Sequence, residues 1–304
     1  MFIYRLLKIH TMKKIYQIEP SLGIEEKAEL VDVINSGWFT EAKKTKEFER
    51  KFADFTNCKY ACTVTSGTAG LYLGLLAMEL KKNDEVIVPD LTFVASPNAI
   101  QAVGAKPILC DIEKETLNLD LEKLEKKITR KTKAIMIVNF NGRTTNMKQL
   151  KDISKKYNLK LIEDAAHSLG SYYKNSHQGT NSDLGVFSFS TPKIITTGQG
   201  GMIITNKKNI YERCCELKDF GRKIGAKKNV RSAFDHKIIG YNFKFTEFQA
   251  GIGISQMKKL PKLIVKKKKM FQKYEESFKN IKQIEFIKTD LKTITPWMAD
   301  IILD

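Results

Sequence analysis

Apolar residues in the middle of the chain alternate between short continuous runs and longer helical patterns. The short runs are rich in β-branched residues, as buried strands are, and the patterns between them repeat every three to four residues. Such a series predicts an α/β fold with a mostly parallel sheet between helices. The predicted strands are 60–65, 85–89, 106–112, 132–140, 159–164, 185–190 and 200–205, and the helices between them are 68–80, 96–103 and 146–157.

Amphipathic patterns flank this region on both sides. Helices are predicted over 24–37 and 45–55, and a long helix follows from Met257 to Ile281, which Pro261 should bend or begin. Residues 293–304 are expected to form the opening strand of a further domain. The predicted organisation is a large domain over 12–255, then a linking helix and the start of an incomplete small C-terminal α/β domain over 256–304.

Composition narrows the classes of function. The net charge is +18, but the lysines are spread along the chain without interleaved aromatic residues, so no nucleic-acid binding is expected. No apolar run approaches the roughly 20 residues of a membrane helix. The five cysteines show no paired spacing and the four histidines are scattered, so we expect no metal site, no disulfide framework and a cytoplasmic location with reduced thiols.

Lys193 stands out because it is the only charged residue between Asp183 and Lys207. A lysine held among small and apolar residues loses hydration, which lowers its pKa. The neutral amine is then a nucleophile toward a carbonyl group, with which it can form a Schiff base. The alternative is a lysine whose amine simply reaches solvent.

Two more features lie where predicted strands end. The stretch "SGTAG" (66–70) opens a helix, and its backbone amides form a ready anion site, although a plain helix cap fits as well. Asp164 ends an apolar strand, where a carboxylate needs a cationic or hydrogen-bonding partner unless it caps a helix. Ligands bind at this edge of a parallel sheet. A phosphate cradle, a buried acid and a desolvated lysine are together what pyridoxal phosphate requires.

The sequence resembles the sugar-nucleotide aminotransferases of the DegT/StrS group, which are fold-type I pyridoxal-phosphate enzymes. The resemblance runs from about Tyr16 to the end of the chain. It implies a fold-type I large domain and the start of a small one, and because family members usually continue further, it implies a C-terminally truncated chain. The matching stretches are "SGWFTEAKKTKEFERKFADF", "TSGTAGLYLGLLA", "DEVIVPDLTFVASPNAI", "VGAKPILCDI", "EDAAHSLGS", "FSFSTPKIITTGQGG" and "GYNFKFTEFQAGIGISQM".

The resemblance implies roles for individual residues. Lys193 would form the Schiff base and move the proton, Asp164 would pair with the pyridinium nitrogen, and His167 would lie near the phenolic oxygen. Phe93 would stack on the pyridine ring, and Asn242 would reach the phosphate of a partner subunit, which implies a homodimer with a shared site. The phosphate would be held by Gly67, Thr68, Ala69 and Ser188.

The resemblance also implies a substrate side. Trp38, Phe39 and Thr40 would line the substrate site. The cations that could meet a substrate diphosphate are Lys43, Lys44, Arg222 and Lys223. Without the resemblance, the aromatic residues read equally as core residues, His167 as a satisfied buried histidine, and the four cations as surface charge.

The implied function is a transaminase that moves an amino group, taken in this family from L-glutamate, onto a nucleotide-linked keto-sugar. A 4-keto-6-deoxy sugar is an example, and amino-sugar or glycan biosynthesis is the implied context. One alternative is a pyridoxal-phosphate-dependent sugar dehydratase. Some relatives with that activity have His in place of the lysine, so Lys193 argues against it. The other is a truncated, non-catalytic homologue. The complete set of site residues argues against it, and the truncated end argues for it.

Overall fold

The computed structural model describes residues 19–225, 236 and 238–303. Its centre is a seven-stranded sheet in which every strand except β9 runs in the same direction. The predicted mostly parallel sheet is therefore confirmed, with β9 as its one reversed strand. The order across the sheet is β1 (Tyr60–Val64), β9 (Gly201–Thr205), β8 (Leu184–Ser188), β5 (Lys160–Asp164), β4 (Thr132–Val138), β2 (Glu85–Pro89) and β3 (Lys106–Cys110).

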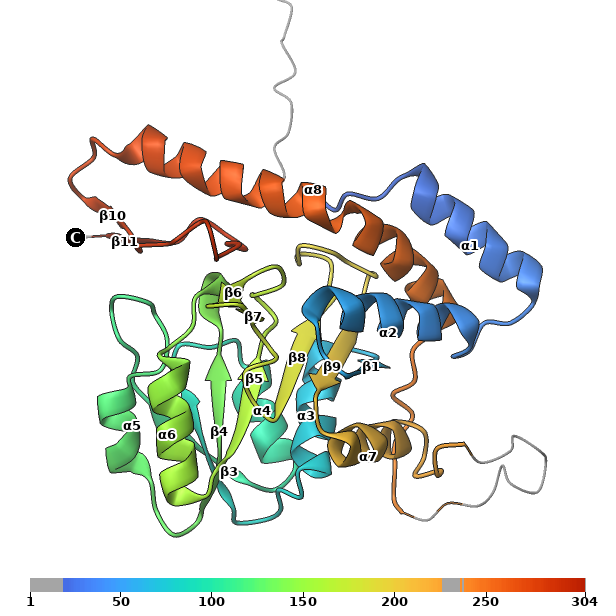
Figure 1. Cartoon of the computed structure of the whole chain (residues 1–304), viewed down its shortest axis with the longest axis horizontal. Helices are drawn as coiled ribbons and strands as arrows, with labels where there is room; N and C mark the ends of the chain where they lie inside the picture. The colour runs from blue at the N-terminus through green and yellow to red at the C-terminus, as the bar shows by residue number, and fades with distance from the viewer. Residues whose placement is uncertain (1–18, 226–235, 237, 304) are drawn as a thin grey trace, which may run out of the picture.

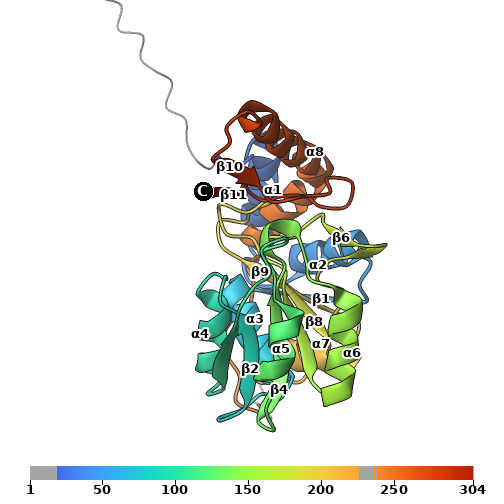
Figure 2. The same ribbon diagram turned by 90° about the vertical axis from the view of Figure 1, so that its left-hand side faces the viewer.

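Helices cover both faces of the sheet, as Figure 2 shows edge-on. Strand side chains alternate between the faces, so in β2 Val86 and Val88 pack with one helix layer and Ile87 with the other. One layer holds α3 (Gly67–Ala77), α4 (Ala95–Ala102) and α7 (Lys208–Lys218), and the other holds α2 (Lys43–Thr56), α5 (Leu121–Lys127) and α6 (Met147–Tyr157). The sequence did not predict the two charged helices α5 and α7.

Two further helices lie across one end of the sheet. They are α1 (Ile24–Ser36) and α8 (Glu247–Phe278), which pack against each other (Figure 1). α8 is one helix of 32 residues that begins at a Thr246–Gln249 capping box and continues through Pro261. It starts ten residues before the predicted apolar stripe, so the predicted domain boundary at 255/256 falls inside it. The division into two domains stays a prediction.

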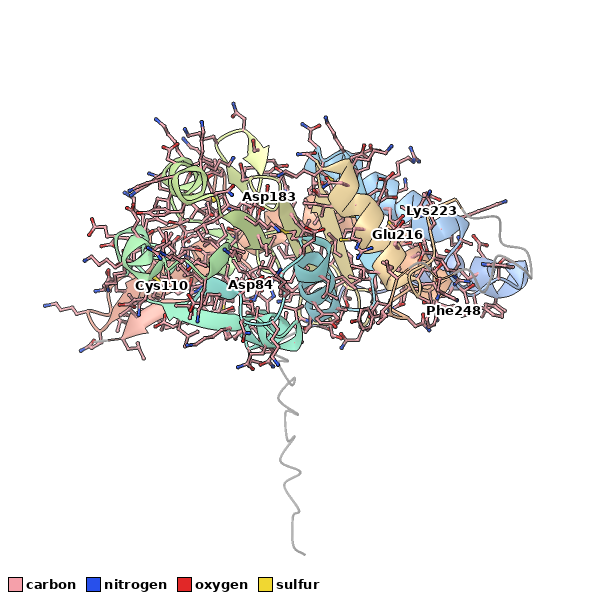
Figure 3. All side chains as sticks on the ribbon, turned by 90° about the horizontal axis from the view of Figure 1, so that it is seen from below. Asp84, Cys110, Asp183, Glu216, Lys223 and Phe248 are labelled. Atoms are coloured by element: carbon pink, nitrogen blue, oxygen red, sulfur yellow. The ribbon has the colours of Figure 1, made fainter. Side chains whose placement is uncertain are left out.

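The arrows of β4 and β8 in Figure 1 point toward this end, so the carboxyl ends of the parallel strands face α8. Figure 3 shows the opposite end, where Asp84 and Asp183 lie just before β2 and β8. No helix in the described part of the chain is long and apolar enough to cross a membrane.

The C-terminal residues only partly follow the predicted strand over 293–304. β11 (Ile301–Leu303) pairs antiparallel with β10 (Ile284–Phe286), while residues 293–300, here called the strap, are irregular. The strap does not form a strand because its polar groups bond instead to loops between the strands of the large sheet. The backbone amide of Tyr172, for example, donates to the Thr293 carbonyl at 2.8 Å. Tyr172 belongs to a small hairpin of β6 (Tyr172–Tyr173) and β7 (Ser176–His177).

A buried ion cluster ties β1 to α2 and α7. Glu49 accepts hydrogen bonds from the amide and hydroxyl of Thr63, each at 2.9 Å. Lys218 donates to the Thr63 carbonyl at 3.1 Å and lies 3.5 Å from Glu49 and 2.9 Å from Glu41. Burial alone would raise the pKa of Glu49, but Lys218 and Lys46 outweigh it and lower the pKa. The cluster therefore fixes β1, which leads directly into residues 66–70.

The substitution Lys218→Met should destabilise the fold by about 3–5 kcal/mol, because it leaves buried carboxylates without their cation. Urea unfolding measures this. The matched control is Lys208→Met in the same helix, whose exposed pair with Glu212 should be worth less than about 1 kcal/mol. Equal unfolding midpoints for the two variants would show that the cluster does not hold β1.

Candidate active site

The register of three strands brings the predicted phosphate-binding residues together. Gly201 of β9 pairs with Val64 of β1 on one side and with Ser188 of β8 on the other. The turn after β1 therefore meets Ser188 across Gly201. A Cβ atom on Gly201 would lie 2.6 Å from the Ser66 carbonyl group and 2.7 Å from the Gly67 nitrogen, and one on Gly67 would lie 3.0 Å from the Ser188 Cβ. Only glycine permits this close approach.

The turn opens α3. Ser66 caps the helix by accepting a hydrogen bond from the Ala69 amide at 3.1 Å, and the first intrahelical bond runs from Gly70 to the Ser66 carbonyl at 3.0 Å. The amides of Gly67 and Thr68 come before that bond and have no partner within the helix, so they can donate hydrogen bonds to an anion. The helix dipole also favours negative charge at this end. The helix-cap reading is confirmed, and the anion site stays a prediction that the two remaining amides allow. Thr68 is exposed, which leaves its hydroxyl free to reach a ligand.

Asp164 ends β5 and is almost fully buried. Its Oδ2 accepts a hydrogen bond from the Ser96 hydroxyl at 2.7 Å, and its Oδ1 accepts one from the Ala166 amide at 3.1 Å. Burial raises the pKa of Asp164, and these two donors and Lys193 only partly oppose that effect. A cationic ring nitrogen beside this carboxylate would favour its ionised form.

Lys193 lies in the loop between β8 and β9, at the same end of the sheet. Burial lowers its pKa from 10.5 to about 8, and the charge of Asp164 limits that fall. At pH 7 roughly a tenth of the amine is then neutral, compared with less than a thousandth for an ordinary lysine. The half-buried Lys193 and the direction of its pKa shift agree with the prediction of a desolvated lysine, whose role stays a prediction.

His167 is buried between two aromatic rings. The ring of Trp297 stacks on it at a centroid distance of 4.1 Å, and Phe140 meets it edge-on at 5.6 Å. Burial and the charge of Lys193 lower the pKa of His167 to about 3, so the ring is neutral at pH 7. Its buried Nδ1 has no hydrogen-bond partner among the described residues. An oxygen atom of a bound ligand would satisfy that nitrogen.

Two predicted cofactor residues lie at the surface. Phe93 lies in the loop between β2 and α4 and leaves 69% of its area exposed. Asn242 is also exposed and forms an isolated bridge with Asp219. An exposed position is what a contact with a partner subunit requires, but a single chain does not test that role.

The predicted substrate residues lie beside the start of α8. Phe39 stacks on Phe248 at 5.3 Å, Thr40 pairs with Thr246, and Trp38 is exposed. The neighbouring Gln249 side chain donates to the Gln199 carbonyl at 2.7 Å, which links this corner to the loop that carries Lys193.

The four predicted diphosphate cations differ in their surroundings. Lys44 pairs with Glu29 at 2.6 Å, and Arg222 pairs with Asp219 at 2.5 Å, so the charges of both are already engaged. Lys43 and Lys223 are exposed. Among the described residues no group of three or more His, Cys, Asp or Glu side chains could hold a metal ion.

Sequence reasoning missed two residues that complete the site. Ser96, fully buried, is the hydroxyl that holds Asp164, and Trp297 covers both His167 and Lys193. A serine in the first turn of a helix at a strand's carboxyl end was a usable signal for Ser96. No local sequence pattern marked Trp297 as a site residue, because its position in the site depends on the path of the strap.

The residues present fit pyridoxal phosphate. A glycine-lined helix N-terminus, a buried carboxylate, an amine with a pKa of about 8 and an orphaned ring nitrogen lie at one edge of one sheet. These groups match the phosphate, the ring nitrogen, the aldehyde and the phenolic oxygen of that cofactor.

Comparisons with known proteins agree with this geometry. The model of the DegT/DnrJ/EryC1/StrS aminotransferase family matches residues 20–303. GDP-perosamine synthase of Escherichia coli O157:H7 is 39% identical over 292 residues, which cover 96% of this chain and 78% of that protein.

Two solved structures share the fold. Helicobacter pylori PseC, an aminotransferase involved in the biosynthesis of pseudoaminic acid, gives a TM-score of 0.88 at 30% identity. The match covers 96% of this chain and 78% of the PseC chain. A GDP-4-keto-6-deoxymannose-3-dehydratase with a trapped PLP-glutamate geminal diamine gives a TM-score of 0.88 at 27% identity. The match covers 96% of this chain and 80% of the dehydratase chain.

The substitution Gly201→Ala should weaken pyridoxal phosphate binding by at least about tenfold, because the new methyl group displaces the residue 66–67 backbone that would meet the phosphate. Equilibrium dialysis measures this. The affinity for pyridoxal, which lacks the phosphate, should change much less. Gly23→Ala is the matched control, since its Cβ would meet only ordinary contacts. Equal losses for both ligands would argue against a phosphate cradle at this turn.

Proposed function

Because the chain belongs to the DegT/DnrJ/EryC1/StrS aminotransferase family, we propose that it transfers the amino group of L-glutamate to the ketone of a nucleotide-linked 4-keto-6-deoxy sugar. The enzyme class and the cofactor, pyridoxal phosphate, follow from the family. The donor and the sugar are the proposal. The lowered pKa of Lys193, near Asp164, supports the amino-transfer chemistry. The sugar is proposed from the similarity to GDP-perosamine synthase, and the donor from the PLP-glutamate geminal diamine in the dehydratase structure of the same fold.

The chain's own groups divide the work of holding the cofactor. When bound, pyridoxal phosphate supplies an electron sink through which an amino group moves between two carbon atoms. The amides of Gly67 and Thr68 and the hydroxyls of Thr68 and Ser188 would bind its phosphate. The Ala69 amide, which donates to the Ser66 hydroxyl, would join them by giving up that bond. Asp164, fixed by Ser96, would accept a hydrogen bond from the ring nitrogen and keep it protonated.

Lys193 would have two tasks at its Nζ atom. With a pKa of about 8 it provides neutral amine for attachment to the cofactor's aldehyde. Once released, the same Nζ can carry a proton to or from the carbon atom that gains or loses nitrogen. His167 is neutral and would hydrogen-bond the phenolic oxygen through a ring nitrogen, while the exposed ring of Phe93 would be covered by the cofactor.

The substrate side is proposed from position and charge. Trp38, Phe39 and Thr40 would line the sugar's entrance beside α8. Lys43 and Lys223 have exposed charges that can meet a diphosphate, whereas Lys44 is committed to Glu29. The reaction balances without another reactant: glutamate leaves as 2-oxoglutarate, and the sugar ketone becomes a primary amine.

We extend the proposal to assembly and context. The exposed Asn242 would complete the phosphate site of a partner subunit in a homodimer. The large domain would span 12–255, of which 12–18 lie outside the described residues, and the small domain would begin within 256–304. A cytoplasmic enzyme of amino-sugar biosynthesis is consistent with five unbridged cysteines.

A sugar dehydratase is the second candidate, and the observation that favours it is the fold shared with GDP-4-keto-6-deoxymannose-3-dehydratase. Lys193 favours amino transfer, because a proton carrier that also attaches to the cofactor serves a repeated exchange of nitrogen.

The two functions give different products from the same mixture. The chain, pyridoxal phosphate, a GDP-linked 4-keto-6-deoxy sugar and ¹⁵N-labelled L-glutamate are incubated, and the nucleotide sugar is analysed by mass spectrometry. Amino transfer should place ¹⁵N in the sugar, keep every other hydroxyl and release 2-oxoglutarate. Lys193→Met should yield no such product.

Loss of a sugar hydroxyl without retained ¹⁵N would instead identify a dehydratase. If a folded, cofactor-loaded chain converts glutamate to 2-oxoglutarate but leaves this sugar unchanged, the donor is right and the sugar is wrong.

A further inference from the structure

The strap carries an aromatic side chain into the site. The Nζ atom of Lys193 lies 4.1 Å from the centre of the Trp297 ring, over its face. The same indole stacks on His167 at 4.1 Å with an interplanar angle of 25°, and its Nε1 donates to the Pro192 carbonyl at 2.7 Å. Trp297 thus contacts the residue before Lys193, the amine of Lys193 and the neighbouring His167 at once.

Hydrogen bonds on both sides of Trp297 fix the strap. On one side, the Thr295 amide donates to the Ser171 hydroxyl at 2.9 Å, and the Thr295 hydroxyl donates to the Gly170 carbonyl at 2.8 Å. On the other side, the Met298 amide donates to the Asn141 side chain at 2.9 Å.

The end of the strap is anchored more strongly still. Asp300 forms a buried ion pair with Arg143, which is only 2% exposed, and Asn141 donates to Asp300 at 2.6 Å. An indole held from both sides in this way has one position. Its contact with Lys193 is therefore a built feature of the fold.

Two opposite effects act on the Lys193 amine at this contact. Removing water favours the neutral amine, while the negative face of an indole attracts the ammonium form. Three other titratable groups face the pair: Asp164, His167, and Lys267 of α8, whose Nζ donates to the Trp297 carbonyl at 2.7 Å. His167 is neutral, so the indole and Asp164 are the groups that favour the ammonium.

We propose that Trp297 is a positioning residue for Lys193, whose indole face holds the free ε-ammonium group beside Asp164 whenever that amine is not attached to the cofactor. This role rests on the proposed function, in which Lys193 must be released and then act as a proton carrier. A long flexible side chain would otherwise sample many rotamers or turn to solvent. The indole keeps the charged amine within the site and so ready to return.

This role can be tested on the apo chain by a measurement that needs neither bound cofactor nor enzyme activity. Acetic anhydride acylates only neutral amines, so the rate of Lys193 acylation against pH, read by peptide mass spectrometry, gives the pKa of that amine. The native value is expected near 8. Trp297→Leu keeps an apolar cover but removes the cation–π attraction, so the pKa should fall by about 1 unit.

The sign of the pKa shift distinguishes a Trp297 that attracts the ammonium group from one that only excludes water. If Trp297 only excludes water, the smaller Leu admits water and the pKa should rise toward 10.5. Trp297→Phe retains an aromatic face but loses the hydrogen bond to Pro192, so it should shift the pKa less than Trp297→Leu does. Trp38→Phe, at the other of the two tryptophans, should cause no shift. A rise, or no change, in Trp297→Leu overturns the proposal.

A second measurement does not require Trp297 to be changed. In Trp38→Phe the only tryptophan is Trp297, and the charge over its ring should shift its emission as Lys193 titrates, with a midpoint near 8. The double variant Trp38→Phe with Lys193→Met should lose this transition, which excludes Lys267 as its source. A flat titration in Trp38→Phe overturns the proposal even if Trp297→Leu does not fold. Neither result depends on whether the chain transfers amino groups.

Discussion

The loss of water around the Lys193 amine is the physical constraint on which the site depends. An ordinary lysine at neutral pH is a hydrated cation and a poor nucleophile. Here burial lowers the pKa of that amine to about 8, while the charge of Asp164 limits the fall. We propose that the Trp297 indole, 4.1 Å from Nζ, adds to the effect of Asp164. The result is an amine that is available in both protonation states near neutral pH, as a group that both attaches to a carbonyl and carries a proton must be.

The sheet supplies the geometry for this constraint. Gly201 lets β1, β9 and β8 meet so closely that the start of α3 lies against Ser188, and β5 sets Asp164 beside them. The Glu49–Lys218 cluster fixes β1, the strand that precedes the turn at residues 66–67. Anion site, acid and amine therefore come from separate segments of sequence that only the strand order brings to one edge (Figure 1).

Much of this was readable from the sequence because it depends on local patterns. Continuous apolar strands predicted the parallel sheet, the pattern over 146–157 predicted α6, and the isolation of Lys193 in sequence predicted that its amine would lose hydration. The strap was not readable. Trp297 lies 105 residues from Pro192, and its place follows from hydrogen bonds that an irregular segment makes with distant loops. The short charged helix α5 was missed because its two buried leucines make too brief a stripe.

Covalent mapping of the cofactor tests the central claim most directly. The purified chain is incubated with pyridoxal phosphate, reduced with borohydride and digested, and the modified peptide is identified. The chain has 45 lysines, so the position of the label is informative. The account predicts stoichiometric label on Lys193 at a cofactor concentration that leaves surface lysines unmodified. A folded chain that takes up no label, or takes it up on other lysines, would contradict it.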